Sequence, residues 1–348
     1  HIPETIGVNL PTHFHEEPMF VTISLFFVMM FITGPMAYVY KYRGRARYNG
    51  VSEYLRRGWP LFTPFNCLLY LFSQSKARPP IMNLKDFSEL DKIKNNWQVI
   101  QREALNLKAN KYFESTNKPG SAAYYDIGFH TFFRYGWSKF YLTWYGYTHK
   151  SAKELCPETV NILETIPSVN GAMFSYLPAG SRLNRHLDPL ACSLRYHLGL
   201  ATPNSDNCFI NIDTVSYSWR DGEALLFDET FIHYAKNNTD QDRLILMCDI
   251  DRPMNLFGRF INLLYKGLVG LTVVPNLEGD KRGFVNSLYS GLSPLIKKSK
   301  DLKATNRPLY LLLKYTVNTT LISIVFFLIL IVSLSLAGAF KFISSLIH

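Results

Sequence analysis

The sequence predicts a mainly β domain of the sandwich or jelly-roll type, with flanking helices and two transmembrane helices. Between positions 170 and 251, short runs rich in β-branched and aromatic residues alternate with turn residues. Many short strands separated by turns are typical of a sandwich or jelly roll. Two uncharged runs, 18–40 and 315–340, are each long enough to cross about 30 Å of hydrocarbon as a helix. Residues 86–113 have a helical pattern.

The N-terminal tail, residues 1–18, carries Glu4, Glu16 and Glu17 but no Lys or Arg. A signal peptide needs a basic segment there, so we expect no cleavage. The transmembrane helix 19–40 follows, and a second one, 315–340, precedes a short tail, 341–348. The alternative interpretation is that both runs are buried core helices, but both exceed the 10–14 residues that are usual for such a helix.

Positive charge is concentrated beside the two uncharged runs. Residues 41–57 hold six Lys or Arg against one Glu, for a net charge of +5, and residues 281–314 hold eight against one Asp, for +7. Residues 58–280 have no net charge, whereas a nucleic-acid binder usually carries basic charge on its folded domain. By the positive-inside rule, residues 41–314 lie in the cytoplasm and both termini lie outside.

Two shorter hydrophobic stretches, 59–73 and 254–275, are too short or too charged to span a bilayer. The first contains two prolines, and the second carries Arg259 and Lys266. We expect both to lie in the bilayer interface, with ordinary core packing as the alternative. The chain therefore divides into a basic and interfacial segment (41–85), a folded domain (86–253), and interfacial helices with a basic linker (254–314).

The five cysteines include no CxxC pair, and their number is odd. This pattern argues against a disulfide framework and favours buried or free thiols in a reducing compartment.

The candidate metal ligands are His186, Asp188 and His233. Two imidazoles and one carboxylate can hold a ferrous ion on one face and leave positions for a co-substrate and dioxygen. We expect His186 and Asp188 on a loop, 183–190, where residues i and i+2 of an extended backbone point the same way. Zinc is chemically possible at the same residues. The alternative without a metal is a surface His-x-Asp and a core His233.

Arg243, ten residues after His233, can bind the far carboxylate of a 2-oxo acid. In the run SLRYHLGL (193–200), alternation places Arg195 and His197 on one face, which is either exposed or lines a polar pocket. The tripeptide 220–222, Arg-Asp-Gly, predicts a tight turn. Arg182 and Arg185, beside the His-x-Asp motif, could meet lipid phosphates or be solvated loop charges.

Seven stretches carry a resemblance to a known family: FNCLLYLFS, GWSKFYLTWY, GAMFSYLPAGSRLNRHLDP, SLRYHLGL, NCFINID, YSWRDGEALLFDETFIH and DRLILMCDIDRP. The chain resembles the aspartyl/asparaginyl β-hydroxylase family over residues 36–255. Within that family it is similar to bacterial lipid A 2-hydroxylases of the inner membrane. The long N-terminal tail and the second apolar run depart from that pattern.

The resemblance implies a double-stranded β-helix with iron on His186 and His233, and Asp188 as the third ligand. It places 2-oxoglutarate on Arg243, with further contacts from Arg195 and His197. We therefore expect an Fe(II)/2-oxoglutarate dioxygenase that uses O2, in the bacterial inner membrane, with its catalytic domain facing the cytoplasm.

The expected substrate is an acyl chain of a membrane lipid, first of all a secondary acyl chain of lipid A hydroxylated at C2. Two uncharged spans suit a lipid substrate, because exposing an acyl chain to water costs about 0.8 kcal/mol per CH2. Ornithine-type lipids or a protein Asp/Asn side chain are alternative substrates, and a non-catalytic lipid-binding protein is the alternative of another class. The expected partners are the substrate lipid and the bilayer, with no nucleic acid and no obligate protein partner.

Overall fold

The computed structural model describes residues 16–116, 118–129 and 132–347. Of the predicted tail, 1–18, residues 1–15 lie outside the described residues, and residues 16–18 already belong to helix α1 (Glu16–Lys41). The chain forms two units: residues 38–293 make one, and residues 1–37 with 294–348 make the other.

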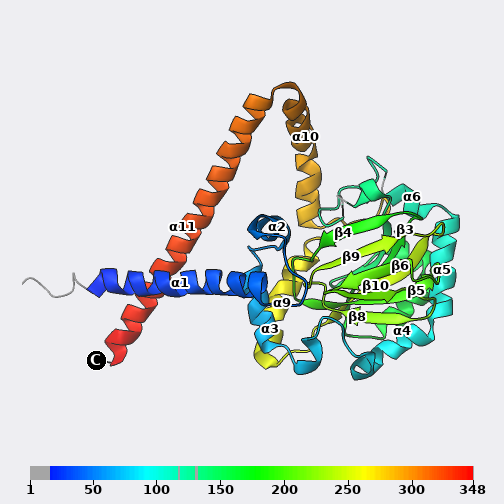
Figure 1. Ribbon diagram of the computed structural model, residues 1–348, viewed down its shortest axis with the longest axis horizontal. Helices are drawn as coiled ribbons and strands as arrows, with labels where there is room; N and C mark the ends of the chain where they lie inside the picture. The colour runs from blue at the N-terminus through cyan, green and yellow to red at the C-terminus, as the bar shows by residue number, and fades with distance from the viewer. Residues whose placement is uncertain (1–15, 117, 130–131, 348) are drawn as a thin grey trace, which may run out of the picture. The chain divides into compact units, whose positions relative to one another are not determined.

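Two antiparallel sheets form the centre of the 38–293 unit, which confirms the predicted jelly roll (Figure 1). The larger sheet has the order β2 (Tyr147–Thr148), β1 (Ser138–Trp144), β3 (Val169–Leu177), β10 (Arg243–Asp251), β5 (Ser193–Ala201) and β8 (Ala224–Phe227). The smaller sheet has the order β4 (Arg182–His186), β9 (His233–Asn237), β6 (Cys208–Ile212) and β7 (Val215–Ser218). Strands β3 and β5 both pair with β10, so residues far apart in the sequence meet at the centre.

The two faces of the larger sheet bury different sets of side chains. Leu194, Tyr196, Leu198 and Leu200 of β5 point into a core beneath the helices, as the alternation predicts. The opposite face of the larger sheet and the inner face of the smaller sheet share a second core, which includes Met247, Ile210 and Ala235. The functional residues of β5 and β10 lie on this inner face.

Short helices cover the outer face of the larger sheet (Figure 1). They are α4 (Asp91–Asn95), α5 (Trp97–Ala109), α6 (Tyr112–Thr116), α7 (Lys150–Leu155) and α8 (Pro157–Glu164). Helix α5 buries Ile100, Ala104 and Leu107 at helical spacing, which fixes the face it presents to the sheet. The predicted helical segment 86–113 is thus a 3-10 segment, η3 (Leu84–Leu90), followed by three helices.

The structure corrects several predicted strand boundaries. Strands β1, β2, β4 and β7 were not predicted. His186 ends strand β4 instead of lying on a loop. The polar sequence RLNRH of β4 has no apolar alternation to reveal it. The predicted turn at 220–222 is confirmed, since the Glu223 amide donates to the Arg220 carbonyl at 3.1 Å and Gly222 has φ +74°.

Helices α3 (Thr63–Phe72) and α9 (Leu256–Gly270) cross at a close contact in the 38–293 unit. A Cβ on Gly258 would lie 2.6 Å from Cβ of Phe72, so a larger residue there would push the helices apart. Helix α9 buries Asn262, Tyr265 and Val269 on one side. Its other side exposes Leu256, Phe257, Phe260, Leu263, Leu264 and Leu268.

Two further helices are long and apolar enough to cross a membrane, over Val21–Lys41 of α1 (Glu16–Lys41) and Arg307–Ala339 of α11 (Arg307–Ile347). The second apolar helix begins at Arg307, earlier than the predicted start at residue 315. Pro308 lies in its first turn, where proline is tolerated, and neither proline nor glycine follows before residue 315. Helix α10 (Phe284–Thr305) precedes it. The remaining short elements are α2 (Val51–Arg57), η2 (Ser75–Ala77) and η4 (Phe133–Tyr135).

Candidate active site

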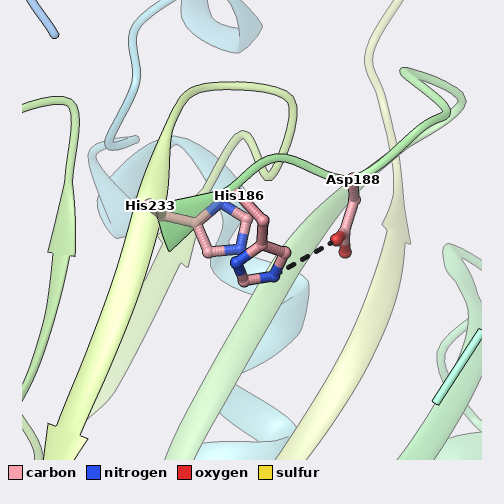
Figure 2. A group of neighbouring side chains, drawn as sticks. All are labelled: His186, Asp188 and His233. Carbon is pink, nitrogen blue, oxygen red and sulfur yellow. Dashed lines mark ion pairs between the residues drawn. The ribbon is translucent and has the colours of Figure 1, made fainter. Parts of the chain in front are cut away.

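The structure brings His186, Asp188 and His233 together at one end of the smaller sheet (Figure 2). His186 at the end of β4 pairs directly with His233 at the start of β9, and Asp188 follows two residues after His186. One ligand atom from each residue lies within 4.8 Å of the others. The Nε2 atom of His186 is 3.7 Å from Oδ1 of Asp188. Among the described residues, this is the only group of three such side chains with that spacing.

Backbone carbonyls orient both imidazoles. Nδ1 of His186 lies 2.7 Å from the Asn184 carbonyl, and Nδ1 of His233 lies 2.9 Å from the Phe231 carbonyl. Each Nδ1 therefore carries the hydrogen and donates it, which leaves the Nε2 lone pair available to a metal. Hydrogen bonds of this kind hold metal-binding imidazoles in one orientation.

Burial also prepares the ligands electrostatically. It lowers the pKa of His233 to about 3 and lowers the pKa of His186 below its usual value, so both rings are neutral at pH 7. Burial opposes ionisation of Asp188, but the Arg195 guanidinium and His186 outweigh it and lower the pKa of that carboxyl. Two neutral imidazoles and one carboxylate are the donor set that suits Fe(II).

Arg195 is surrounded by carboxylates of the chain itself. Its Nη2 lies 3.4 Å from Oδ2 of Asp188 and also contacts Glu229, while its Nε lies 2.8 Å from Oδ1 of Asp249. Its proposed contact with an oxo acid stays a prediction. The guanidinium thus contacts three carboxyl groups at once.

Sequence reasoning missed Glu229 and Asp249. Burial raises the pKa of both carboxyl groups, well above the usual value for Glu229. A local signal for Asp249 existed, because alternation in β10 places it on the same face as Arg243 and Met247. Glu229 lies outside any strand, so periodicity could not have placed it.

Arg243 is a buried cation without a carboxylate partner among the described residues. Its side chain lies under the ring of Trp219, at 4.5 Å from the ring centroid, and Nη2 donates to the Ser175 hydroxyl at 3.1 Å. Its Nε has no hydrogen-bond partner within that part of the chain. Burial lowers the pKa of Arg243 to about 10, so it remains charged at pH 7. A buried, unpaired guanidinium calls for an anion, and its fork of N–H groups suits a carboxylate.

His197 faces the same space from β5. Its Nδ1 accepts a hydrogen bond from the Trp219 indole at 3.4 Å, and burial lowers its pKa well below the usual value. The neutral ring therefore carries its hydrogen on Nε2, which has no partner in the described structure. This N–H could donate to the same anion as Arg243. Trp219, which sequence reasoning also missed, holds both residues.

A cavity of about 780 Å³ connects these residues to the surface. One end is lined by His186, Asp188, His233, His197 and Arg243. The other end is lined by apolar side chains of Leu61, of helix α3 and of helix α9. The lining residues of the two helices are Phe65, Leu68, Ile261, Leu264 and Leu268. Four of these apolar side chains, Leu61 included, are exposed, so the cavity opens between apolar side chains: Leu61, Phe65, Leu264 and Leu268.

Arg182 and Arg185 do not line this cavity. Arg182 is exposed on β4. Arg185 is half-buried, its guanidinium contacts the Arg47 carbonyl, and its own carbonyl accepts a hydrogen bond from Arg57 at 3.0 Å. Their contact with a lipid headgroup stays a prediction.

Parts of this chain are similar to known proteins. Residues 94–253 match the family described as aspartyl/asparaginyl beta-hydroxylase. An ornithine lipid ester-linked acyl 2-hydroxylase from Rhizobium tropici is 35% identical over 127 residues, which are 36% of this chain and 45% of that protein. The human aspartyl/asparaginyl beta-hydroxylase is 28% identical over 179 residues, 48% of this chain and 22% of that protein. The chain thus spans less than half the length of both relatives.

Among solved structures, a Pseudomonas putida prolyl-4-hydroxylase aligns with 45% of this chain and 87% of its own, with 13% identity and a TM-score of 0.31.

Proposed function

We propose that this chain is an Fe(II)/2-oxoglutarate-dependent hydroxylase of a membrane-lipid acyl chain. The match of residues 94–253 to the aspartyl/asparaginyl β-hydroxylase family supports this proposal. One observation carries the proposal. The cavity that contains His186, Asp188 and His233 opens between exposed apolar side chains of α3 and α9. A site that bears metal ligands inside and apolar side chains at its mouth suits a substrate with a long hydrocarbon chain.

In this proposal His186, Asp188 and His233 hold Fe(II). When bound, the iron would activate dioxygen, so that one oxygen atom enters an unactivated C–H bond and the other enters succinate as 2-oxoglutarate loses CO2. Arg243 would bind the distal carboxylate of 2-oxoglutarate, and the Nε2–H of His197 would donate to it. The apolar wall would exclude water and position the acyl chain.

The physical argument for a lipid is the cost of moving an acyl chain through water. At about 0.8 kcal/mol per CH2, exposing ten methylenes would cost roughly 8 kcal/mol. A mouth that meets the bilayer removes this cost. We propose that the exposed apolar side of α9, with α3 beside it, lies in the bilayer interface.

The lipid class is the finer part of the proposal. The Rhizobium tropici relative favours an ornithine lipid, hydroxylated at C2 of its ester-linked acyl chain. A secondary acyl chain of lipid A is the substrate that the sequence resemblance favours. The human relative suggests an Asp or Asn side chain of a protein as an alternative substrate. An apolar entrance, however, suits an acyl chain better than a polar peptide. The complete ligand set and the unpaired Arg243 argue against a non-catalytic lipid-binding protein.

We further propose that Val21–Lys41 and Arg307–Ala339 cross the bacterial inner membrane, with the catalytic domain in the cytoplasm. The basic flanks at 41–57 and 281–314 support this orientation. It places the site where Fe(II) and 2-oxoglutarate are available.

The test uses the full chain in detergent with Fe(II), 2-oxoglutarate and O2. It is supplied separately with ornithine lipid, lipid A, and a peptide that contains Asp and Asn. We expect one lipid class to gain the mass of one oxygen atom at C2, with succinate formed in equal amount and no product from the His233→Ala variant. Hydroxylation of the peptide alone would overturn the lipid proposal. Absence of succinate with every substrate would overturn the proposal that this chain is an enzyme.

A further inference from the structure

Arg43 lies two residues beyond the end of α1, within the basic segment that the sequence assigns to the membrane surface. The structure corrects this assignment for Arg43, because its side chain is only 7% exposed. The guanidinium is held between the rings of Tyr70 and Phe231, at 3.9 and 3.8 Å from their centroids. A cation in this position contributes little to attraction between the protein and a bilayer.

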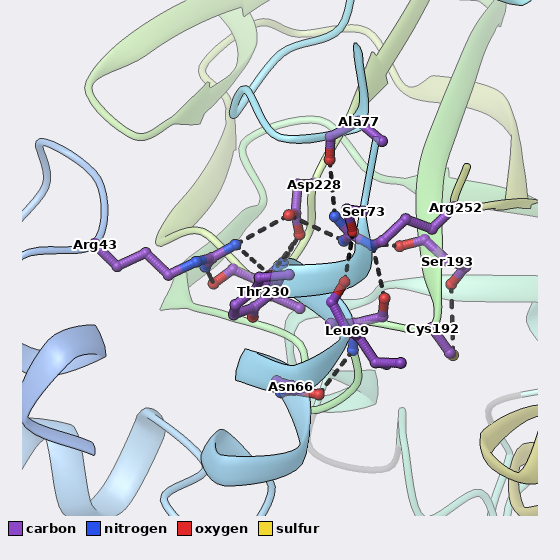
Figure 3. A network of polar contacts seen from close by, with 12 residues as sticks. Arg43, Asn66, Leu69, Ser73, Ala77, Cys192, Ser193, Asp228, Thr230 and Arg252 are labelled. Carbon is purple, nitrogen blue, oxygen red and sulfur yellow. Dashed lines mark hydrogen bonds and ion pairs between the residues drawn. The ribbon is translucent and has the colours of Figure 1, made fainter. Parts of the chain in front are cut away.

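The side-chain hydrogen bonds of Arg43 all reach one loop, residues 228–232 (Figure 3). Its Nη1 donates to the Thr230 carbonyl at 2.6 Å, and its Nη2 donates to the Thr230 hydroxyl at 2.9 Å and to Asp228 Oδ2 at 3.0 Å. Arg43 thus binds backbone and side chains of this loop at once.

This loop positions two of the proposed metal ligands, His233 and Asp188. It leads directly into His233 at the start of β9. The Glu229 carbonyl accepts the Asp188 amide at 2.9 Å, so the loop also fixes the backbone of Asp188. A shift of the loop would therefore move two of the three ligands together.

The residues after Arg43 reinforce the contact through Asp213. Oδ1 of Asp213 accepts the amides of Arg45 and Ala46 at 2.6 and 2.8 Å, and the Asp213 amide donates to the Ile232 carbonyl at 2.9 Å. Gly44 has φ +73°, and a Cβ there would lie 2.5 Å from Oδ1 of Asp213. Only glycine allows this approach. Residues 43–46, called here the juxtamembrane strap, thus hold the loop at both of its ends.

We propose that Arg43 is a positioning residue for the metal site: through the juxtamembrane strap, the chain that leaves the first apolar helix sets the geometry of His233 and Asp188. The inference rests on the proposed metal site but not on the identity of the substrate. Removing Arg43 leaves Asp228 paired with Arg252 at 2.9 Å. Arg252 in turn donates to the carbonyls of Ala77, Ala191 and Ser193 (Figure 3), so the surrounding fold keeps its own support.

The experiment compares the full-length wild type with Arg43→Gln, Arg43→Lys and Arg45→Gln in detergent. Arg45 is the matched control, because it is an exposed cation of the same segment and its strap contact uses only the backbone. Fe(II) affinity is measured under argon by competition with a chromophoric chelator. The ligand-field absorption of the Co(II)-loaded protein reports coordination geometry, and thermal melting of the metal-free protein reports folding.

We expect Arg43→Gln to lower Fe(II) affinity by roughly 10- to 100-fold, as for other residues that orient metal ligands, and to change the Co(II) spectrum. Arg43→Lys, which can pair with Asp228 but cannot reach both groups of Thr230, should give an intermediate affinity. Arg45→Gln should match the wild type.

Wild-type affinity and spectrum in Arg43→Gln would overturn the positioning role, and so would an equal loss in Arg45→Gln. If Arg43→Gln does not fold, Arg43→Lys decides in the same way: wild-type affinity and spectrum overturn the inference, and a weaker, altered site supports it. Failure of the wild type to bind metal would instead overturn the proposed function, and the inference with it.

Discussion

Replacing Arg243 by Lys should weaken the binding of 2-oxoglutarate and leave the binding of the lipid unchanged. Arg243 is 3% exposed and has no carboxylate partner within the described residues, so a dicarboxylate would supply its missing counter-ion. Lysine keeps the charge but replaces a planar fork by a point charge, which loses one of two charge-assisted hydrogen bonds. Such a bond contributes about 1.5–3 kcal/mol.

At roughly 1.4 kcal/mol per factor of ten, this loss predicts a KM for 2-oxoglutarate that rises about 10- to 100-fold. The assay measures succinate release against 2-oxoglutarate concentration at saturating lipid, and then against lipid concentration at saturating 2-oxoglutarate. The control is Arg220→Lys, because Arg220 pairs with the exposed Asp206 and lies outside the cavity lining. An unchanged KM for 2-oxoglutarate in Arg243→Lys would remove Arg243 from the co-substrate site.

Further predictions concern the metal site, its pH dependence, the topology and the entrance. His233→Ala should abolish turnover and most iron binding, measured by metal content after gel filtration; full activity would refute the ligand assignment. The pKa of His233 is about 3 in the folded protein against 6.5 unfolded, so protonation favours the unfolded chain. Metal-free protein should therefore lose stability as pH falls from about 6.5 toward 3, with a smaller loss in His233→Gln; equal melting curves would contradict this. A periplasm-only reporter should give signal after His348 but not near Gly120, and the reverse pattern would invert the orientation. Phe260→Ser on the exposed side of α9 should slow hydroxylation of bilayer lipid several-fold, whereas Val215→Ser, which is also apolar and exposed but lies on β7, should not; equal rates would refute the docking surface.

Local patterns in the sequence were sufficient for the β5 assignment. A strand has a period of two, so the split between Leu194, Tyr196 and Leu198 on one side and Arg195 and His197 on the other follows from sequence order alone. The two apolar helices were also predictable, because length and lack of charge are local properties. Strand β4 escaped prediction because its polar sequence lacks such a pattern.

The candidate site was predictable as a set of residue types but not as a geometry. His-x-Asp, a later His and an Arg suggested ligands and an oxo-acid contact from chemistry and resemblance. Their convergence depends on the register that pairs His186 with His233, which a strand's own sequence does not specify. The same holds for Asp249 opposite Arg195, where the pairing of β10 with β5 supplies the contact.

The sequence by itself therefore determined the apolar strands such as β5, the two apolar helices and the chemistry of the candidate ligands, because these depend on neighbouring residues. Only the tertiary structure decided that Arg43 is buried against a loop 185 residues away and that the cavity opens between α3 and α9. Charge alone placed Arg43 with its basic neighbours. Contacts between distant segments arise from packing and strand register, which no single stretch of sequence encodes.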